Sequence, residues 1–190
     1  MAKIDSNRNQ VMVKICFYGA NPAAAFRNLQ IASASIPERT RSALTQLGGS
    51  GSHLWTLSFT PLLKPGVKAE RELALHLYAL DAPIDEEGLG LLMTGTDVLV
   101  FVAEVDPARQ AATLQAWRQA DAALNAKGAD PQAVIIQGVG ESTPTAEELA
   151  ALRSALGLHP GDTVTAARLD GTEMVQTVKA AAQKARSLLG

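Results

Sequence analysis

The sequence predicts an α/β fold in which a mostly parallel sheet of about six strands, with one antiparallel hairpin strand, has helices on both faces. Three observations predict this fold. Residues 97–105 are almost wholly apolar, as in a parallel strand covered on both faces. Residues 70–80 place an aliphatic side chain at every second position, as in a half-buried strand. Helix-start signals separate the later strands, which favours crossover connections within one domain over residues 1–190.

The beginning of the chain predicts a strand followed by a helix. Residues 11–18 are apolar and β-branched at their start, and this run stops at Gly19. Residues 23–35 are rich in alanine and place apolar residues at helical spacing. Pro37 predicts the end of that helix, because proline disfavours the helical conformation in the residue before it.

The next segment predicts an antiparallel hairpin. A Gly-Ser stretch at 48–52 is typical of a flexible joint, and residues 54–63 form a strand candidate. Residues 64–68 (KPGVK) are a strong turn signal, and the alternating run 70–80 follows directly. The two runs are therefore predicted to pair with each other.

In the second half of the chain, the helix starts are the clearest signals. Asp106 and Pro107 suit the N-cap and first position of a helix that Gly128 ends. Thr145 and Glu148 match a capping box. Apolar runs and periodicity predict the remaining elements: a short helix or turn at 89–93, strands at 133–137 and 163–167, a helix ending near Gly157, and an amphipathic helix at 172–189.

Composition excludes several classes of function. The chain is 47% hydrophobic and 19% charged, with a net charge of −2 and scattered Lys and Arg, which argues against a nucleic-acid or anionic-lipid partner. No run approaches the roughly 18–20 apolar residues of a membrane span, so a cytoplasmic protein without membrane insertion is expected. One cysteine and three widely spaced histidines do not fit a zinc site. No metal, cofactor or catalytic residue is predicted.

The loop after the first strand is where such a fold would bind phosphate, at a helix N-terminus. A working phosphate loop has the form G-x-x-x-x-G-K-[ST], in which the glycines let the backbone wrap the phosphates, the lysine reaches the terminal phosphates and the hydroxyl holds Mg²⁺. Counting from Gly19, the second glycine is Ala24, the lysine is Ala25 and the hydroxyl is Phe26. These degenerate positions predict the loss of phosphate binding.

A set of short segments, in one order and at nearly constant spacing, carries a resemblance to a known family. The segments are Lys14–Gly19, Asn28–Gln30, Leu57–Leu62, His76–Tyr78, Gly95–Asp97, Val100–Ala103 and Ile136–Gln137. On these segments the chain resembles the bacterial gliding-motility (MglA-type) small GTPases of the Ras superfamily, from about residue 10 to the final helix. The resemblance implies a Ras-like, P-loop three-layer sandwich.

The departures from that family all fall on the nucleotide-binding elements. The family's turn at the Mg²⁺ and γ-phosphate corresponds to Asp81–Pro83, which has neither a glycine nor a glutamine to orient water. The guanine-reading Asn-Lys-x-Asp corresponds to Val139–Ser142, and the last base-contacting loop corresponds to Arg168–Gly171. The resemblance therefore implies a pseudo-GTPase that neither binds nor hydrolyses GTP.

Three hypotheses about function follow. The first is a protein-interaction or scaffold module in motility or polarity regulation, whose partner is implied to be a roadblock-type regulator or a motility or polarity effector. The implied partner surface lies within 55–92 and includes Trp55, Leu57, Phe59, Asp81 and Pro83. The second is an atypical nucleotide-binding GTPase or NTPase that uses Arg27 or Lys14, and the third is a structural homodimer. In the first hypothesis, side chains such as Phe26 fill the former nucleotide pocket and fix one conformation.

Other candidate residues have simpler interpretations. The acidic run 85–87 is expected to be a solvated loop and not a metal site. Cys16 is expected to be a buried core residue, since nothing in the sequence supplies a base for a nucleophile. His76 is expected at the surface or in hairpin packing, and Trp117 in the core, whereas Trp55 is as well explained by partner binding as by packing.

Overall fold

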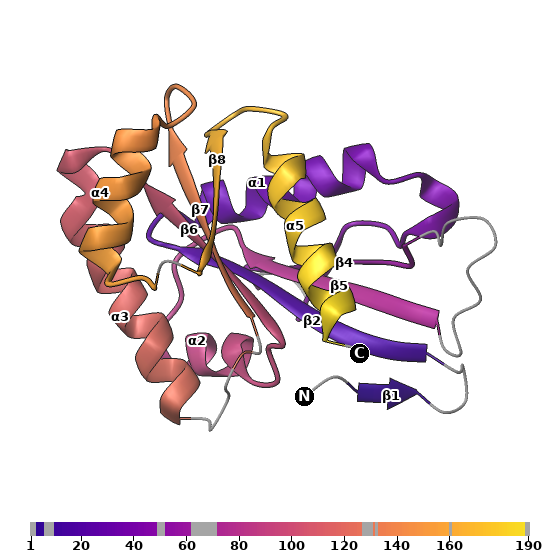
Figure 1. Ribbon diagram of the computed structural model, residues 1–190. Coiled ribbons are helices and arrows are strands. Elements are labelled where there is room, and N and C mark those ends of the chain that lie inside the picture. The colour runs from indigo at the N-terminus through magenta and orange to yellow at the C-terminus, as the bar shows by residue number, and fades with distance from the viewer. Residues whose placement is uncertain are drawn as a thin grey trace.

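The computed structural model describes residues 3–5, 10–48, 52–61, 72–126, 131, 133–159 and 161–188. Within these residues eight strands form one sheet, in the order β3-β4-β5-β2-β6-β7-β8, with β1 beside β2 (Figure 1). The predicted α/β class is confirmed, and the order of the six expected strands is that of a Ras-like sandwich. The count of about six is too low, because β1 and β3 were not expected.

The strands pair in two ways. The bounds are β1 Lys3–Asp5, β2 Gln10–Gly19, β3 Thr45–Leu47, β4 Leu54–Phe59, β5 Glu72–Leu80, β6 Val98–Glu104, β7 Ala133–Gly140 and β8 Thr163–Arg168. The centre is parallel, since β2 pairs with β5 and β6, β6 with β7, and β7 with β8. The predicted antiparallel pairing of β4 with β5 is confirmed, and the pairs β1–β2 and β3–β4 are also antiparallel.

Helices cover both faces of the sheet, as predicted (Figure 1). Helices α1 (Pro22–Ser35) and α5 (Met174–Ser187) contact each other and lie on one face. Helices α2 (Glu86–Met93), α3 (Gln110–Ala126) and α4 (Ala146–Leu156) lie on the other, where α3 contacts both α2 and α4. Short 3₁₀ turns occupy Glu38–Thr40 and Pro107–Arg109.

The predicted helix ends are confirmed by their hydrogen bonds. The Thr145 side chain accepts from the Glu148 backbone, and the Glu148 carboxylate accepts in return from the Thr145 backbone, which completes the capping box. Gly157 ends α4 in the left-handed conformation. The Asp106 carboxylate caps the turn that leads into α3.

The alternation along β5 sorts its side chains between the two faces as predicted. Leu73, Leu75, Leu77 and Ala79 are buried in the cluster under α1 and α5. Tyr78 and Leu80 pack on the opposite face with α2 and α3. In β4 the residues that join the α1 side are Trp55, Leu57 and Phe59.

A buried polar network ties α1 to the sheet and to α5. The side-chain amides of Asn28 and Gln137 donate to each other, with N···O distances of 2.9 and 3.0 Å. Gln137 also donates to the Thr177 hydroxyl at 2.9 Å, and Thr177 shares a 2.8 Å hydrogen bond with Thr165. Asn28, Gln137 and Thr177 are fully buried. The amides satisfy each other, so burying them here is compatible with a stable core.

Some predicted features lie wholly or partly outside the described residues. These are most of the Gly-Ser joint (49–51), the ends of the predicted hairpin strands together with the turn 64–68, and Gly128. Elsewhere, β7 continues three residues past the predicted end at residue 137, and the short helix predicted at 89–93 begins three residues earlier, at Glu86.

Candidate functional site

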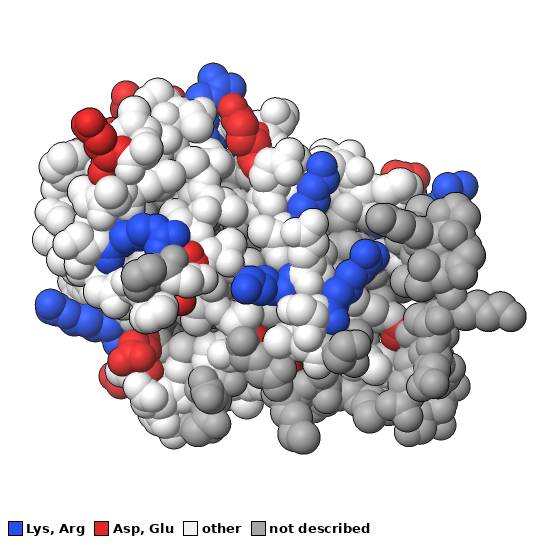
Figure 2. All heavy atoms as spheres, viewed as in Figure 1, with Lys and Arg blue, Asp and Glu red and all other residues white. Residues whose placement is uncertain are grey.

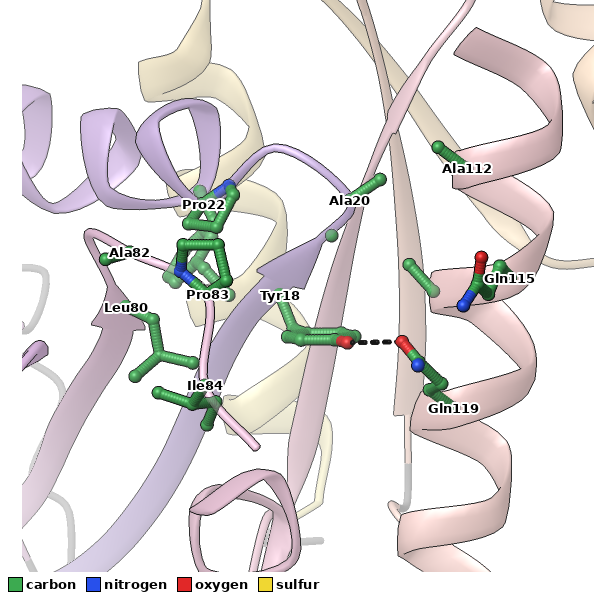
Figure 3. Close-up of a pocket in the computed structure, with 14 residues that line it drawn as sticks. Tyr18, Ala20, Pro22, Leu80, Ala82, Pro83, Ile84, Ala112, Gln115 and Gln119 are labelled. Atoms are coloured by element: carbon green, nitrogen blue, oxygen red, sulfur yellow. Dashed lines mark hydrogen bonds between the residues drawn. The ribbon is translucent and has the colours of Figure 1, made fainter. Parts of the chain in front are cut away.

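A pocket of about 290 Å³ opens where the carboxyl ends of β2 and β5 meet α1 and α3 (Figure 3). This is where open α/β sheets bind ligands. Tyr18 lies at its centre, with Pro22 and Pro83 on one side and Gln115 and Gln119 of α3 on the other. None of the described residues that line it carries a charge: Phe17, Tyr18, Gly19, Ala20, Pro22, Ala25, Leu80, Ala82, Pro83, Ile84, Ala112, Gln115, Ala116 and Gln119.

The connection from β2 to α1 contains only Ala20 and Asn21, because α1 already begins at Pro22. The Asn21 side chain accepts from the Ala24 amide at 3.2 Å, and the Asn21 carbonyl accepts from the Ala25 amide at 3.2 Å. Pro22 has no amide hydrogen. Three of the positions at the start of α1 therefore offer no free backbone donor: Pro22 has none, and the amides of Ala24 and Ala25 are bonded to Asn21.

Gly19 has a structural reason to be glycine. A Cβ placed on it would lie 2.0 Å from the carbonyl oxygen of Val102 on the neighbouring strand β6. Side chains do not approach a backbone oxygen this closely, so the pairing of β2 with β6 at this point requires glycine. The first glycine of the phosphate-loop pattern is thus explained by the packing of two strands.

The charges near this connection do not favour an anion. The Glu104 carboxylate, at the end of β6, accepts from the Asn21 side chain at 3.2 Å. Arg27 is exposed and donates to Gln30 at 3.2 Å. Arg27 lines a shallow depression over the first turns of α1. Asp81 lines the same depression and carries the opposite charge. Glu104 and Asp81 together outweigh the single positive charge of Arg27, so the connection does not attract an anion.

Lys14 lies away from this end of the sheet. Its ammonium donates to the carbonyls of Leu92 and Thr94, at 2.6 and 2.8 Å, and sits 5.2 Å from the centre of the Tyr78 ring. A cation at the carbonyl end of a helix is stabilised by the helix dipole, so Lys14 caps α2. Gly19 is five residue steps further along the strand, which is about 16 Å. Lys14 therefore does not reach the phosphate position.

Asp81 directly follows β5, and its side chain forms hydrogen bonds to residues at the start of β4, beside the pocket. Its carboxylate accepts from the Trp55 indole N–H at 2.7 Å and contacts Nδ1 of His53 at 2.9 Å. The Trp55 ring packs against Phe26 of α1, with ring centres 5.1 Å apart. Phe26, the residue expected to fill the former nucleotide pocket, is half-buried in this contact. Together the four side chains hold β4, the end of β5 and α1 in one arrangement.

The first half of the segment that corresponds to the guanine-reading motif, Val139 and Gly140, belongs to strand β7. Because β7 extends to Gly140, Val139 is a buried strand residue and its carbonyl accepts from Val105. The Gly140 carbonyl accepts from the amide of Leu169, at the end of β8, at 2.9 Å. Arg168 lies 3.7 Å from Glu173 across the last loop. These contacts are internal to the fold.

The residues predicted as a partner surface fall into different environments. Leu57 is fully buried, which corrects the prediction for this residue, because its position in β4 directs it into the core under α1. Trp55 and Phe59 are half-buried against the same core. Asp81 is half-buried and Pro83 is exposed.

A larger groove lies on the opposite face of the hairpin from α1, between α2 and strands β4, β5 and β2. It measures about 760 Å³ and is lined mostly by apolar side chains, including Leu54, Tyr78 and Leu91. Leu91 on α2 is 66% exposed. His76 also lines the groove, and partial burial lowers the pKa of its imidazole. Sequence reasoning gave no role to this groove, because it depends on which half of the sheet α2 leaves uncovered.

The remaining candidates are structural where the structure describes them. Cys16 is buried, and this desolvation raises the pKa of its thiol despite the nearby Lys14. Trp117 is half-buried and packs edge-on against Phe101, with ring centres 4.9 Å apart. Among the described residues, no three His, Cys, Asp or Glu side chains gather as a metal site would require. No described helix combines the length and the apolar character needed to cross a bilayer.

The pocket residues that sequence reasoning missed are Tyr18, Gln115 and Gln119. Their signal was present but weak: the two glutamines are one helical turn apart, and Tyr18 ends an apolar strand. On the face shown in Figure 2, acidic and basic side chains are dispersed among uncharged atoms. No protein-family model matches the chain, and no curated protein matches it.

Proposed function

We propose that this protein is a pseudo-GTPase of the gliding-motility small-GTPase type, which lacks GTP binding and hydrolysis and acts through protein contacts in motility or polarity regulation. The observation that carries the first part is the Asn21 cap. The amides of Ala24 and Ala25 bond to Asn21, and Pro22 contributes none. Helix α1 therefore starts where a phosphate cradle would have to be.

The energetics support the loss of nucleotide binding. A charge-assisted hydrogen bond contributes roughly 1.5–3 kcal/mol. Ala25 and Phe26 supply neither the ammonium nor the Mg²⁺-binding hydroxyl of a phosphate loop, and the Glu104 carboxylate bonds to the loop itself. Losing several such bonds lowers affinity by several orders of magnitude, since about 1.4 kcal/mol is a factor of ten.

The contacts of Asp81 support a fixed conformation. In a GTPase the loops around the γ-phosphate rearrange on hydrolysis. Here Asp81 bonds to His53 and Trp55 within the protein, and Trp55 packs on Phe26. The protein itself supplies the partners that a nucleotide-dependent contact would provide, which favours a permanent scaffold over a timed switch.

The groove beside α2 is the surface best suited to a protein partner. It is mostly apolar, and Leu91 on its rim is a large, well-exposed aliphatic side chain. We propose a roadblock-type dimeric regulator as the partner, following the resemblance in the sequence. An apolar side chain from such a partner would bury Leu91 and the Tyr78 ring.

Calorimetric titration of the full chain with GTP, GDP and ATP in the presence of Mg²⁺ tests the nucleotide part of the proposal. We expect no binding heat, no release of inorganic phosphate and no rise in the melting temperature. Because a ligand that binds the folded state stabilises it, a rise in melting temperature is an independent sign of binding. Micromolar or tighter affinity for any of the three nucleotides would overturn the proposal.

The partner part needs a separate test. Binding of a purified roadblock-type protein from the same organism is measured for the wild type and for Leu91→Asp. Ala150→Asp, on α4, is the control, since Ala150 is an exposed apolar residue that does not line the groove. We expect Leu91→Asp alone to weaken binding by at least about tenfold, as for a buried apolar contact. Equal binding by both variants, or no binding by the wild type, would contradict the proposal.

A further inference from the structure

The pocket around Tyr18 offers hydrogen-bonding groups without charge. The Tyr18 hydroxyl donates to Oε1 of Gln119 at a long distance of 3.4 Å (Figure 3). Gln115 lies one helical turn before Gln119, and both project from α3 toward Tyr18. Each amide side chain carries a donor and an acceptor, so the α3 side of the pocket can both give and receive hydrogen bonds.

The opposite wall is apolar and flat. Pro22 begins α1, and Pro83 lies in the loop after β5; their rings are neighbours in Figure 3. Ala20 and Ala112 close the upper edge with small side chains. A space of about 290 Å³ between a proline wall and an amide wall accommodates one planar ring system.

The lining selects against charged ligands. None of the described lining residues is basic or acidic, and at the nearest helix N-terminus the amides of Ala24 and Ala25 are bonded to Asn21. Burial raises the pKa of the Tyr18 phenol, so its hydroxyl stays protonated and uncharged. A carboxylate or phosphate here would lose water without gaining a cationic partner.

We propose that this pocket binds an uncharged planar ring bearing a carboxamide or lactam group, with Gln115 and Gln119 hydrogen-bonding to that group and Pro22 and Pro83 against the ring. The ligand is a small molecule and carries no phosphate. The site goes beyond the proposed scaffold function, since it places a small-molecule input next to the Asp81 contacts: Ala82 and Pro83 line the pocket directly after Asp81.

Nicotinamide and nicotinate are a matched pair of probes, because they differ only in a neutral amide against a carboxylate. The full chain, labelled with ¹⁵N, is titrated with each while the side-chain amide signals of Gln115 and Gln119 are followed by NMR. We expect saturable shifts with nicotinamide in the millimolar range, as for so small a ligand. Nicotinate is expected to bind at least about tenfold more weakly, because its charge has no partner in the pocket.

The double variant Gln115→Leu/Gln119→Leu should weaken nicotinamide binding by about tenfold, as the loss of paired hydrogen bonds predicts. Both residues are exposed on α3, so the variant should keep its fold, which the unchanged backbone spectrum would show. Gln176→Leu, an exposed glutamine on α5 across the sheet, is the control. No saturable shift with nicotinamide, equal binding of nicotinate, or equal weakening by Gln176→Leu would overturn the proposal. These readouts do not depend on GTP, so this proposal and the proposed function can fail separately.

Discussion

Removing both members of the Asn28–Gln137 amide pair should cost less stability than the sum of the two single removals. Asn28→Ala deletes two hydrogen bonds to Gln137 and one to the Ala24 carbonyl, at 2.9, 3.0 and 3.2 Å. It leaves the Gln137 carbonyl oxygen buried without a partner, and each such group costs about 1–3 kcal/mol. Together with the lost bonds, we expect about 2–4 kcal/mol for Asn28→Ala. Gln137→Met should cost a similar amount, because it leaves the Asn28 oxygen without a donor.

The double variant Asn28→Ala/Gln137→Met removes both orphaned groups together. The Thr177 hydroxyl keeps its 2.8 Å bond to Thr165, so no new polar group is left unpaired. The double variant should therefore be more stable than the sum of the two single effects predicts, by about 1–3 kcal/mol. The free energy of unfolding of the wild type and the three variants is measured by urea unfolding followed by circular dichroism. The m-value, which is the slope of that free energy against urea concentration, is compared between the four proteins. Additive effects, within about 0.5 kcal/mol, would refute the reasoning.

Three further predictions concern single positions. Gly19→Ala should prevent folding or destabilise the protein strongly, since its Cβ would lie 2.0 Å from the Val102 oxygen, and thermal unfolding of Ala20→Gly next to it is the control. Lys14→Met should remove the cap of α2 and lower the free energy of unfolding by about 1 kcal/mol. Amide hydrogen exchange should then become faster in α2, at Leu92 and its neighbours. Unchanged exchange in α2 would contradict this prediction. For His76, burial lowers the folded pKa, so the stability it contributes is present above the unfolded pKa and is lost as the pH falls through the folded value. His76→Gln should therefore flatten the loss of stability on acidification below about pH 6.5, and an unchanged pH profile would contradict this.

Local signals predicted the centre of the fold well. Buried parallel strands such as β6 are recognisable because they must be apolar throughout, and the alternation in β5 has one face in the core and one toward α2. The capping box at Thr145 is equally local, since both of its hydrogen bonds join residues three apart. Such features depend on few long-range contacts, so the sequence determines them directly.

The errors have long-range causes. The edge strand β3 is three residues long and all three residues are exposed, so it carries no alternating apolar pattern; only its pairing with β4 makes it a strand. Strand β7 runs on to Gly140 because β6 and β8 pair with it on either side along that length. The Tyr18 pocket joins residues from α1, α3 and the loop after β5, and nothing local in the sequence places those three together.

The residues that carry the family resemblance are largely explained by packing. Gly19 allows β2 to approach β6, while Asn28 and Gln137 satisfy each other in the core. In this protein these contacts stabilise the sheet and the helix packed on it, so they support the fold and do not indicate whether GTP binds. The nucleotide question rests instead on the loops, where Asn21 accepts from the amides of Ala24 and Ala25 and Asp81 bonds to His53 and Trp55. In these loops the Ala24 and Ala25 amides and the Asp81 carboxylate already have partners within the protein, and this supports our proposal that it acts through contacts with other molecules and not through phosphate chemistry.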